Sequence, residues 1–98
     1  MTSRFTLPAV NELEEVFDYL NLQQRGLGSE FLDEAERAVA EIGASPHRWP
    51  ELEPGVRRYR LRRFEYGLVY RIRSDHIEII AIMHLARRPG YWRDRLWP

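Results

Sequence analysis

The spacing of the apolar residues changes halfway along this chain, and the change limits the fold more than any other feature of the sequence. Up to residue 43, apolar residues recur every three or four positions, which is typical of amphipathic helices. After a segment that contains Pro46, Pro50 and Pro54, they recur at every second position or form a short run, which is typical of strands. The sequence therefore predicts helices first and a sheet afterwards.

The first helix is predicted to begin around Pro8, which fits a first helical turn because its missing N–H has no helical partner there. Its apolar face repeats at steps of three or four residues: Val10, Leu13, Val16 and Leu20. Acidic residues take the other positions, and we expect them to be solvated and to stabilise the helix: Glu12, Glu14, Glu15 and Asp18. A short strand over residues 5–7 is predicted to precede this helix.

Residues 23–28 are predicted to end the first helix, and Ser29 to act as the N-cap of a second one. The apolar face of the second helix repeats through four residues: Leu32, Ala35, Val39 and Ile42. Gly43 is predicted to end it. Two amphipathic helices with a short glycine-containing connection predict an antiparallel helical hairpin.

Three strands are predicted after a loop over residues 44–55. Residues 56–63 and 66–73 alternate in polarity, and Ser74-Asp75 is a candidate turn between the second strand and the third. The third strand, residues 76–84, is apolar at odd and even positions alike, so we expect it to be central and covered on both sides. A short turn or helix is predicted over residues 89–96.

The order β-α-α-β-β-β predicts an α+β fold in which the helical hairpin packs on one face of a small, mostly antiparallel sheet. The chain has 98 residues and no internal repeat, which fits a single domain over residues 1–98.

All 15 basic residues of the chain are Arg, and they are distributed unevenly. Residues 1–55 hold 4 Arg and 11 acidic residues, whereas residues 56–98 hold 11 Arg and 4 acidic residues. Guanidinium groups that alternate with aromatic and aliphatic residues on strands suit phosphates, carboxylates or stacked bases. We therefore expect an anionic partner, either a polyanion or an acidic protein segment.

Several classes of protein are excluded by composition. The absence of Cys excludes disulfides and thiolate metal sites, and the three His lie far apart without metal-ligand spacing, so no metal or cofactor is expected. The longest apolar run, residues 79–83, is too short for a membrane span, and the N-terminus lacks the apolar core of a signal peptide. We expect a cytoplasmic protein without a membrane partner.

A set of short segments, in this order along the chain, resembles the RelE/ParE family of bacterial toxins. They follow the hairpin and are Trp49-Pro50-Glu51-Leu52, Gly55-Val56-Arg57-Arg58, Arg62-Arg63-Phe64-Glu65-Tyr66-Gly67, Leu68-Val69-Tyr70-Arg71 and Met83-His84-Leu85-Ala86-Arg87-Arg88-Pro89-Gly90-Tyr91-Trp92-Arg93. The resemblance implies the toxin of a type II toxin–antitoxin module, often described as a plasmid stabilisation protein. Such a toxin inhibits growth and forms a heteromeric complex with a cognate antitoxin.

The resemblance leaves two mechanisms open, inhibition of DNA gyrase by ParE-like members and metal-independent mRNA cleavage on the ribosome by RelE-like members. Gly67 stands where the ribonuclease type usually has an Arg, and Leu85 stands near the place of another basic residue. The His-x-x-Arg-Arg-x-x-Tyr-Trp ending looks more like ParE. We therefore favour gyrase, with the ribonuclease as the alternative and a non-toxic protein- or nucleic-acid-binding relative as the second.

If the chain is a ribonuclease, the resemblance and the residue chemistry assign its catalytic groups as Arg60, Arg62, His84, Arg88 and Tyr91. The chain has no Lys and Arg keeps its proton, so the base must be His84, a carboxylate such as Glu65, or a deprotonated Tyr91. His84 suits this role best on its intrinsic pKa. The structural alternative is that His84 simply ends a strand while Tyr91 and Trp92 anchor the C-terminus.

The predicted surface for the target or the antitoxin consists of seven Arg: Arg58, Arg60, Arg62, Arg71, Arg73, Arg87 and Arg88. Three of them alternate along one strand and repel one another, which favours an anionic partner. The alternative is that Arg71 and Arg73 pair across strands with acids such as Glu78 or stay solvated.

Overall fold

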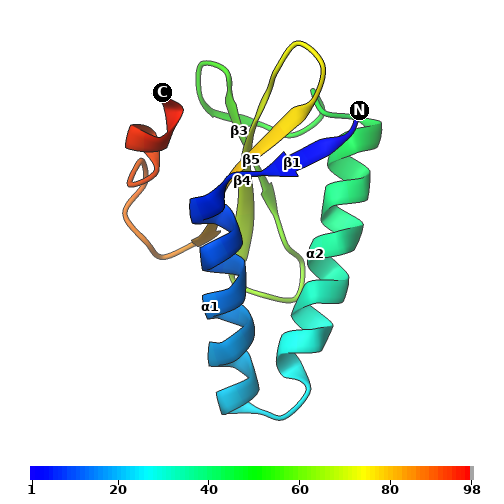
Figure 1. The fold of residues 1–98 in the computed structure, drawn as a ribbon, viewed down its shortest axis with the longest axis vertical. Helices are drawn as coiled ribbons and strands as arrows, with labels where there is room; N and C mark the ends of the chain where they lie inside the picture. Colours follow the sequence, from blue (N-terminus) through cyan, green and yellow to red (C-terminus); the bar gives the residue numbers. More distant parts are fainter. Residues whose placement is uncertain (98) are drawn as a thin grey trace.

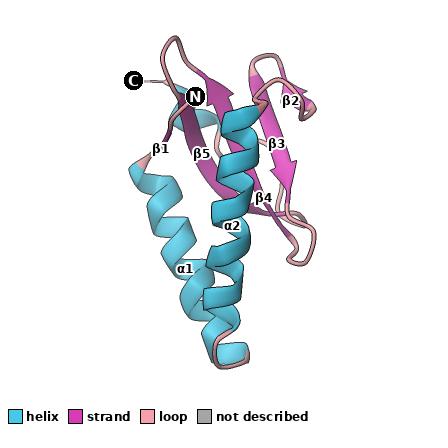
Figure 2. Cartoon of the chain, turned by 90° about the vertical axis from the view of Figure 1, so that its right-hand side faces the viewer, coloured by secondary structure: helices cyan, strands magenta, loops and turns pink. Residues whose placement is uncertain are grey.

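A five-stranded mixed sheet and a two-helix hairpin make up the computed structural model, which describes residues 1–97 (Figure 1). The elements are β1 (Ser3–Phe5), α1 (Leu7–Gln23), α2 (Leu27–Ala44), β2 (Glu51–Glu53), β3 (Val56–Arg60), β4 (Tyr66–Ile72), β5 (Ile77–His84) and a 3₁₀ turn, η1 (Arg93–Leu96). The strands lie in the order β1-β5-β4-β3-β2, and only β1 runs parallel to its neighbour. Both helices lie on the same side of the sheet (Figure 2), which confirms the predicted α+β fold.

The helical hairpin is confirmed, but two of its predicted boundaries are wrong. Helix α2 begins at Leu27, after Gly26 with φ +87°, so Ser29 lies inside the helix and does not cap it. A side chain at Gly28 would meet the Phe17 carbonyl at 2.5 Å, so glycine permits the close approach of the helices there. Gly43 does not end α2; it leaves room for Met1, whose ammonium donates to the Gly43 carbonyl at 3.0 Å.

The start of α1 follows the prediction, because Pro8 occupies the first turn and the Thr6 hydroxyl accepts a hydrogen bond from the Ala9 N–H at 3.3 Å. Strand β1 lies two residues earlier than predicted, since Leu7 already belongs to the helix. The predicted loop over residues 44–55 contains one short strand, β2, which pairs antiparallel with β3.

Strand β3 is three residues shorter than predicted. The Leu61 N–H still donates to the Tyr66 carbonyl at 2.9 Å, but the following amides, those of Arg62 and Arg63, donate to the Glu34 carboxylate of α2 at 2.8 and 3.2 Å, so the strand does not continue. Arg62 therefore lies in the connection to β4 and not on the strand. The predicted bounds of β4 and β5 agree with the structure to within one residue at each end.

Strand β5 is covered on both faces, as its sequence predicts. On the helix side, Ile77, Ile79 and Ile82 pack with the buried faces of α1 and α2. The pairing register shifts where Val69 faces Ala81 and Tyr70 faces Ile79, so Ile80 is an extra residue. This bulge places Ile80 and Ala81 together on the other face, which the C-terminal segment covers with Trp92, a side chain only 1% exposed.

None of the helices within residues 1–97 combines the length and apolarity that crossing a membrane requires.

Candidate functional site

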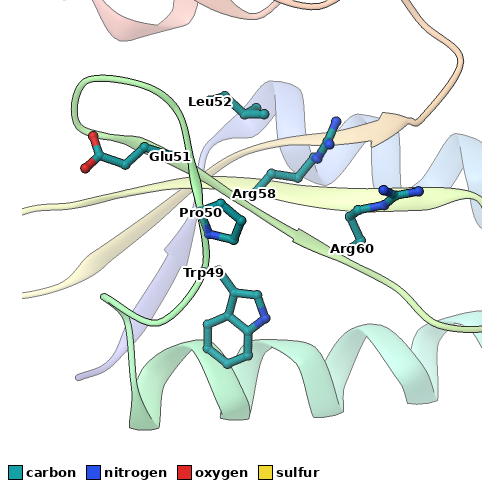
Figure 3. A pocket seen from close by; sticks show the side chains of 6 residues that line it. All are labelled: Trp49, Pro50, Glu51, Leu52, Arg58 and Arg60. Atoms are coloured by element: carbon teal, nitrogen blue, oxygen red, sulfur yellow. The ribbon is translucent and has the colours of Figure 1, made fainter.

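Three guanidinium groups line two adjacent hollows at one end of the sheet: Arg58, Arg60 and Arg62, which we call the arginine triplet. Arg58 and Arg60 line the first hollow with Trp49, Pro50 and Leu52 (Figure 3). Arg60 and Arg62 line the second, and because Arg60 belongs to both, the triplet forms one continuous basic surface.

No member of the arginine triplet forms an ion pair with a carboxylate among residues 1–97, whereas six other Arg do. Glu51 also lines the first hollow, but it points away from Arg58 and Arg60 (Figure 3) and pairs with Arg57 at 3.3 Å. Partial burial, and then the nearby Arg60, lower the pKa of Arg58. The triplet therefore concentrates positive charge that an anionic ligand would neutralise.

Gly67 makes room for the side chain of Arg58. A Cβ atom at Gly67 would lie 3.0 Å from Cγ of Arg58 and 3.1 Å from the Tyr59 carbonyl oxygen. The aliphatic stem of Arg58 thus crosses β4 at the position where the ribonuclease type is expected to carry its own Arg. The side chain that occupies the space beside Gly67 is therefore that of Arg58 from β3.

His84 lies at the end of β5 and lines the second hollow with Arg60 and Arg62. Its Nδ1 accepts a hydrogen bond from the Ala86 N–H at 3.0 Å, so the neutral ring carries its proton on Nε2. That Nε2 lies 3.9 Å from the Glu65 carboxylate. In this arrangement neutral His84 presents a donor, whereas a general base needs a free nitrogen lone pair.

Tyr91 does not line either hollow of the arginine triplet. Its hydroxyl donates to Oε2 of Glu12 at 2.8 Å, and the Arg87 guanidinium lies 3.6 Å from the centre of its ring. Burial, and then the hydrogen bond to Glu12, raise the pKa of Tyr91 well above its usual value. A deprotonated Tyr91 is therefore disfavoured, and the contacts fit an anchor for the C-terminus.

Glu12 is a buried carboxylate that links α1, β5 and the C-terminal segment. Its Oε1 accepts from the Ile82 N–H at 3.0 Å and from Nη1 of Arg95 at 2.8 Å. Its Oε2 accepts from Nη2 of Arg95 at 3.0 Å as well as from Tyr91. The prediction that the acidic residues of α1 are solvated is therefore wrong for Glu12, which is only 9% exposed.

The sequence does contain a signal for the burial of Glu12. This residue lies three positions after Ala9 and four before Val16, within the buried stripe of α1. An acidic residue inside an apolar stripe requires a cationic or hydrogen-bonding partner, although spacing alone does not identify which one.

The remaining predicted residues lie apart from the triplet. Arg71 pairs with Glu78 at 2.7 Å, which is the cross-strand pairing considered as an alternative. Arg73 follows the end of β4 opposite to the one that pairs with His84. Arg87 lies over Tyr91, and Arg88 is exposed.

The two hollows can donate hydrogen bonds and positive charge to phosphates or carboxylates. Trp49, Pro50 and Leu52 add an apolar floor beside Arg58 and Arg60, so the first hollow suits a ligand that is anionic and partly apolar. In the part of the chain that the structure describes, no three side chains of the types that bind metals are grouped to hold an ion.

Comparisons with known proteins agree with this fold. A solved structure titled "Chromosomal ParDE TA system from P. aeruginosa" matches with a TM-score of 0.77 and 19% sequence identity, over 87% of this chain and 96% of that one. No curated protein sequence matches the chain. A sequence model described as "ParE toxin of type II toxin-antitoxin system, parDE" matches residues 4–89. The chain therefore belongs to the ParE toxin family of type II toxin–antitoxin systems.

Proposed function

We propose that this ParE-family toxin stops growth by binding DNA gyrase through the arginine triplet, and that a cognate antitoxin neutralises it in a heteromeric complex. The observation that carries the proposal is the triplet itself, since its three Arg line two hollows that have Arg60 in common and none of them forms an ion pair with a carboxylate within residues 1–97. Such a surface can bind acidic side chains or phosphates without a chemical step.

The placement of the candidate bases also supports binding over catalysis. Nδ1 of His84 already accepts a backbone hydrogen bond, and the Tyr91 hydroxyl is held by Glu12 outside the hollows. One observation favours the ribonuclease alternative, because Arg60, Arg62 and His84 do line one hollow. The two candidates differ in whether proton transfer is needed.

Two assays on the purified protein separate these candidates. We expect inhibition of gyrase-catalysed supercoiling and no cleavage of mRNA on translating ribosomes. Ribosome-dependent cuts without gyrase inhibition would establish the alternative. Normal growth of cells that contain the folded, soluble protein would contradict both mechanisms and favour the interpretation as a non-toxic relative.

The substitution His84→Gln is expected to leave most of the toxicity. The Gln side-chain oxygen can still accept a hydrogen bond, and a binding mechanism needs no proton transfer. A ribonuclease that uses His84 as its base would instead lose about 10²–10⁴-fold in rate. Growth curves after induction measure the effect, and circular dichroism verifies that the variant is folded. Loss of growth inhibition in a folded variant would contradict the binding mechanism.

A further inference from the structure

The outer side of β3 is only partly covered by its neighbour β2. Glu51 pairs with Arg57 and Glu53 pairs with Val56, so β2 lies beside only the first part of β3 (Figure 2). A strand without a neighbour offers its backbone N–H and C=O groups to another chain. The second part of β3 is therefore a place where an extended peptide can join the sheet.

The hydrogen bonds between β3 and β4 show which backbone groups of β3 face outward. The Leu61 N–H donates to the Tyr66 carbonyl at 2.9 Å. Bonded residues alternate along an antiparallel pair, so Tyr59 also bonds toward β4, whereas Arg58 and Arg60 direct their backbone groups away from it. Two N–H groups and two carbonyls of β3 thus face the outer side.

One of these four groups has a partner within residues 1–97. The Arg58 N–H donates to the Pro50 carbonyl at 3.2 Å, but Pro50 has no N–H with which to bond the Arg58 carbonyl in return. The N–H and the carbonyl of Arg60 form no hydrogen bond in the described part of the chain. We call the Arg58 carbonyl and the two backbone groups of Arg60 the free edge of β3.

The side chains beside the free edge are positively charged. Arg58 and Arg60 lie on the side of β3 away from α2 (Figure 3), and their positions on the strand are about 6.8 Å apart. An added strand has the same repeat, so every second side chain of it would lie beside one of the two guanidinium groups. The free edge and the two Arg thus select the same ligand, an extended peptide with carboxylates at alternate positions.

We propose that an extended segment of gyrase, with Asp or Glu at every second position, adds to β3 as a further strand at the free edge. This inference rests on the proposed function, because it names the part of the target that the arginine triplet binds. The carboxylates pair with Arg58 and Arg60, and the backbone bonds to the free edge fix the direction and register of the segment.

Two other partners match the free edge less well. A DNA strand offers phosphates to the guanidinium groups, but its sugar–phosphate backbone has no N–H to donate to the carbonyls of Arg58 and Arg60. A second copy of this chain, paired edge to edge, would place its own Arg58 and Arg60 against these two, and like charges repel.

Three synthetic peptides of about eight residues test the chemistry of the free edge. The first alternates Glu with Thr, the second has ester bonds in place of its amides, and the third has Gln in place of Glu. The ester peptide keeps the charge but loses the N–H donors for the carbonyls of Arg58 and Arg60. We expect the first peptide to bind the intact toxin and each of the other two to bind about tenfold more weakly or worse.

Hydrogen exchange of the Arg60 amide tests the same contact in the complex with gyrase. This amide has no acceptor within the described residues and Arg60 is exposed, so it should exchange quickly in the free toxin. Bound gyrase should slow its exchange by at least about tenfold, because the added strand supplies an acceptor. The amide of Arg88, which is also exposed and lies outside both hollows, is the control and should not change.

These measurements separate the inference from the proposed function. If the toxin does not inhibit gyrase, the proposed function fails, while the peptides still show whether the free edge accepts an acidic strand. If the toxin inhibits gyrase but the Arg60 amide exchanges equally fast in the complex, the proposed function stands and the inference is wrong. Equal binding of the amide and ester peptides, or protection of the Arg60 amide by DNA alone or by a dimer of the toxin, would also overturn it.

Discussion

Replacing Glu12 by Ala should lower the free energy of unfolding by about 3 kcal/mol. The substitution leaves the Ile82 N–H without its acceptor and the Arg95 guanidinium with only the Ile80 carbonyl. Removal of one partner from a buried ion pair typically costs about 3–5 kcal/mol. We expect the lower end of that range because the Arg95 side chain is still 21% exposed and water can reach it. Urea unfolding measures the change, and the melting temperature should fall by at least about 12 °C.

The matched control for this variant is Glu14→Ala, two residues along the same helix. Glu14 is exposed and forms no ion pair within residues 1–97, so its loss should change stability by no more than about 0.5 kcal/mol. In Glu12→Ala the amide of Ile82 should also exchange its hydrogen faster, since its acceptor is gone. Equal stabilities of the two variants would show that Glu12 does not hold the C-terminal segment in place.

Local spacing correctly predicted the two helices and the strand β5, which is covered on both sides. Of the four apolar residues predicted for each helix face, two are buried, Val16 and Leu20 in α1 and Ala35 and Ile42 in α2, and the others are half-buried. These patterns are sufficient to predict a helix or strand because the spacing of apolar residues within the segment indicates whether one or both of its faces are buried.

The boundaries that failed were set by contacts between distant residues. By its residue type alone, Gly43 predicts the end of a helix. In the folded chain its carbonyl oxygen accepts a hydrogen bond from the ammonium group of Met1. A single strand over residues 56–63 fits the alternation, but Glu34 of α2 binds the amides that would continue it. Sequence patterns do not contain these partners, because 28 to 42 residues separate them along the chain.

The sequence predicted an Arg-rich surface, and that surface stays a prediction. The spacing could not tell which Arg would pair with a carboxylate of the same chain. Arg71 and Arg87 each form an ion pair with a carboxylate, whereas no member of the arginine triplet does so within residues 1–97. Glu12 was missed because its partners Tyr91 and Arg95 lie 79 and 83 residues away.

The double substitution Arg60→Ala with Arg62→Ala should abolish growth inhibition while leaving the fold intact. Both side chains are exposed and unpaired within residues 1–97, so stability should change by about 0.5 kcal/mol or less for each. Two charge-assisted hydrogen bonds to an anionic target contribute about 1.5–3 kcal/mol each. Their loss should weaken binding by about 10²–10⁴-fold, which a gyrase supercoiling titration measures.

The matched control removes the same two charges elsewhere. Arg73 and Arg88 are exposed and line neither hollow, so Arg73→Ala with Arg88→Ala should keep most of the toxicity. Equal losses in both double variants would mean that the overall positive charge attracts the target and that the triplet is no specific site. Full toxicity after the loss of Arg60 and Arg62 would remove the arginine triplet from the mechanism.

Exchange of Arg60 and Arg62 for Lys then separates charge from geometry. Lys keeps the positive charge but lacks the planar fork that binds a carboxylate or phosphate through two parallel hydrogen bonds. If the target presents such groups to the triplet, the Lys variant should bind about 10- to 10²-fold more weakly than the wild type yet more tightly than the Ala variant, because it retains about half of each charge-assisted contact. Wild-type inhibition by the Lys variant would instead show that the triplet acts through charge alone.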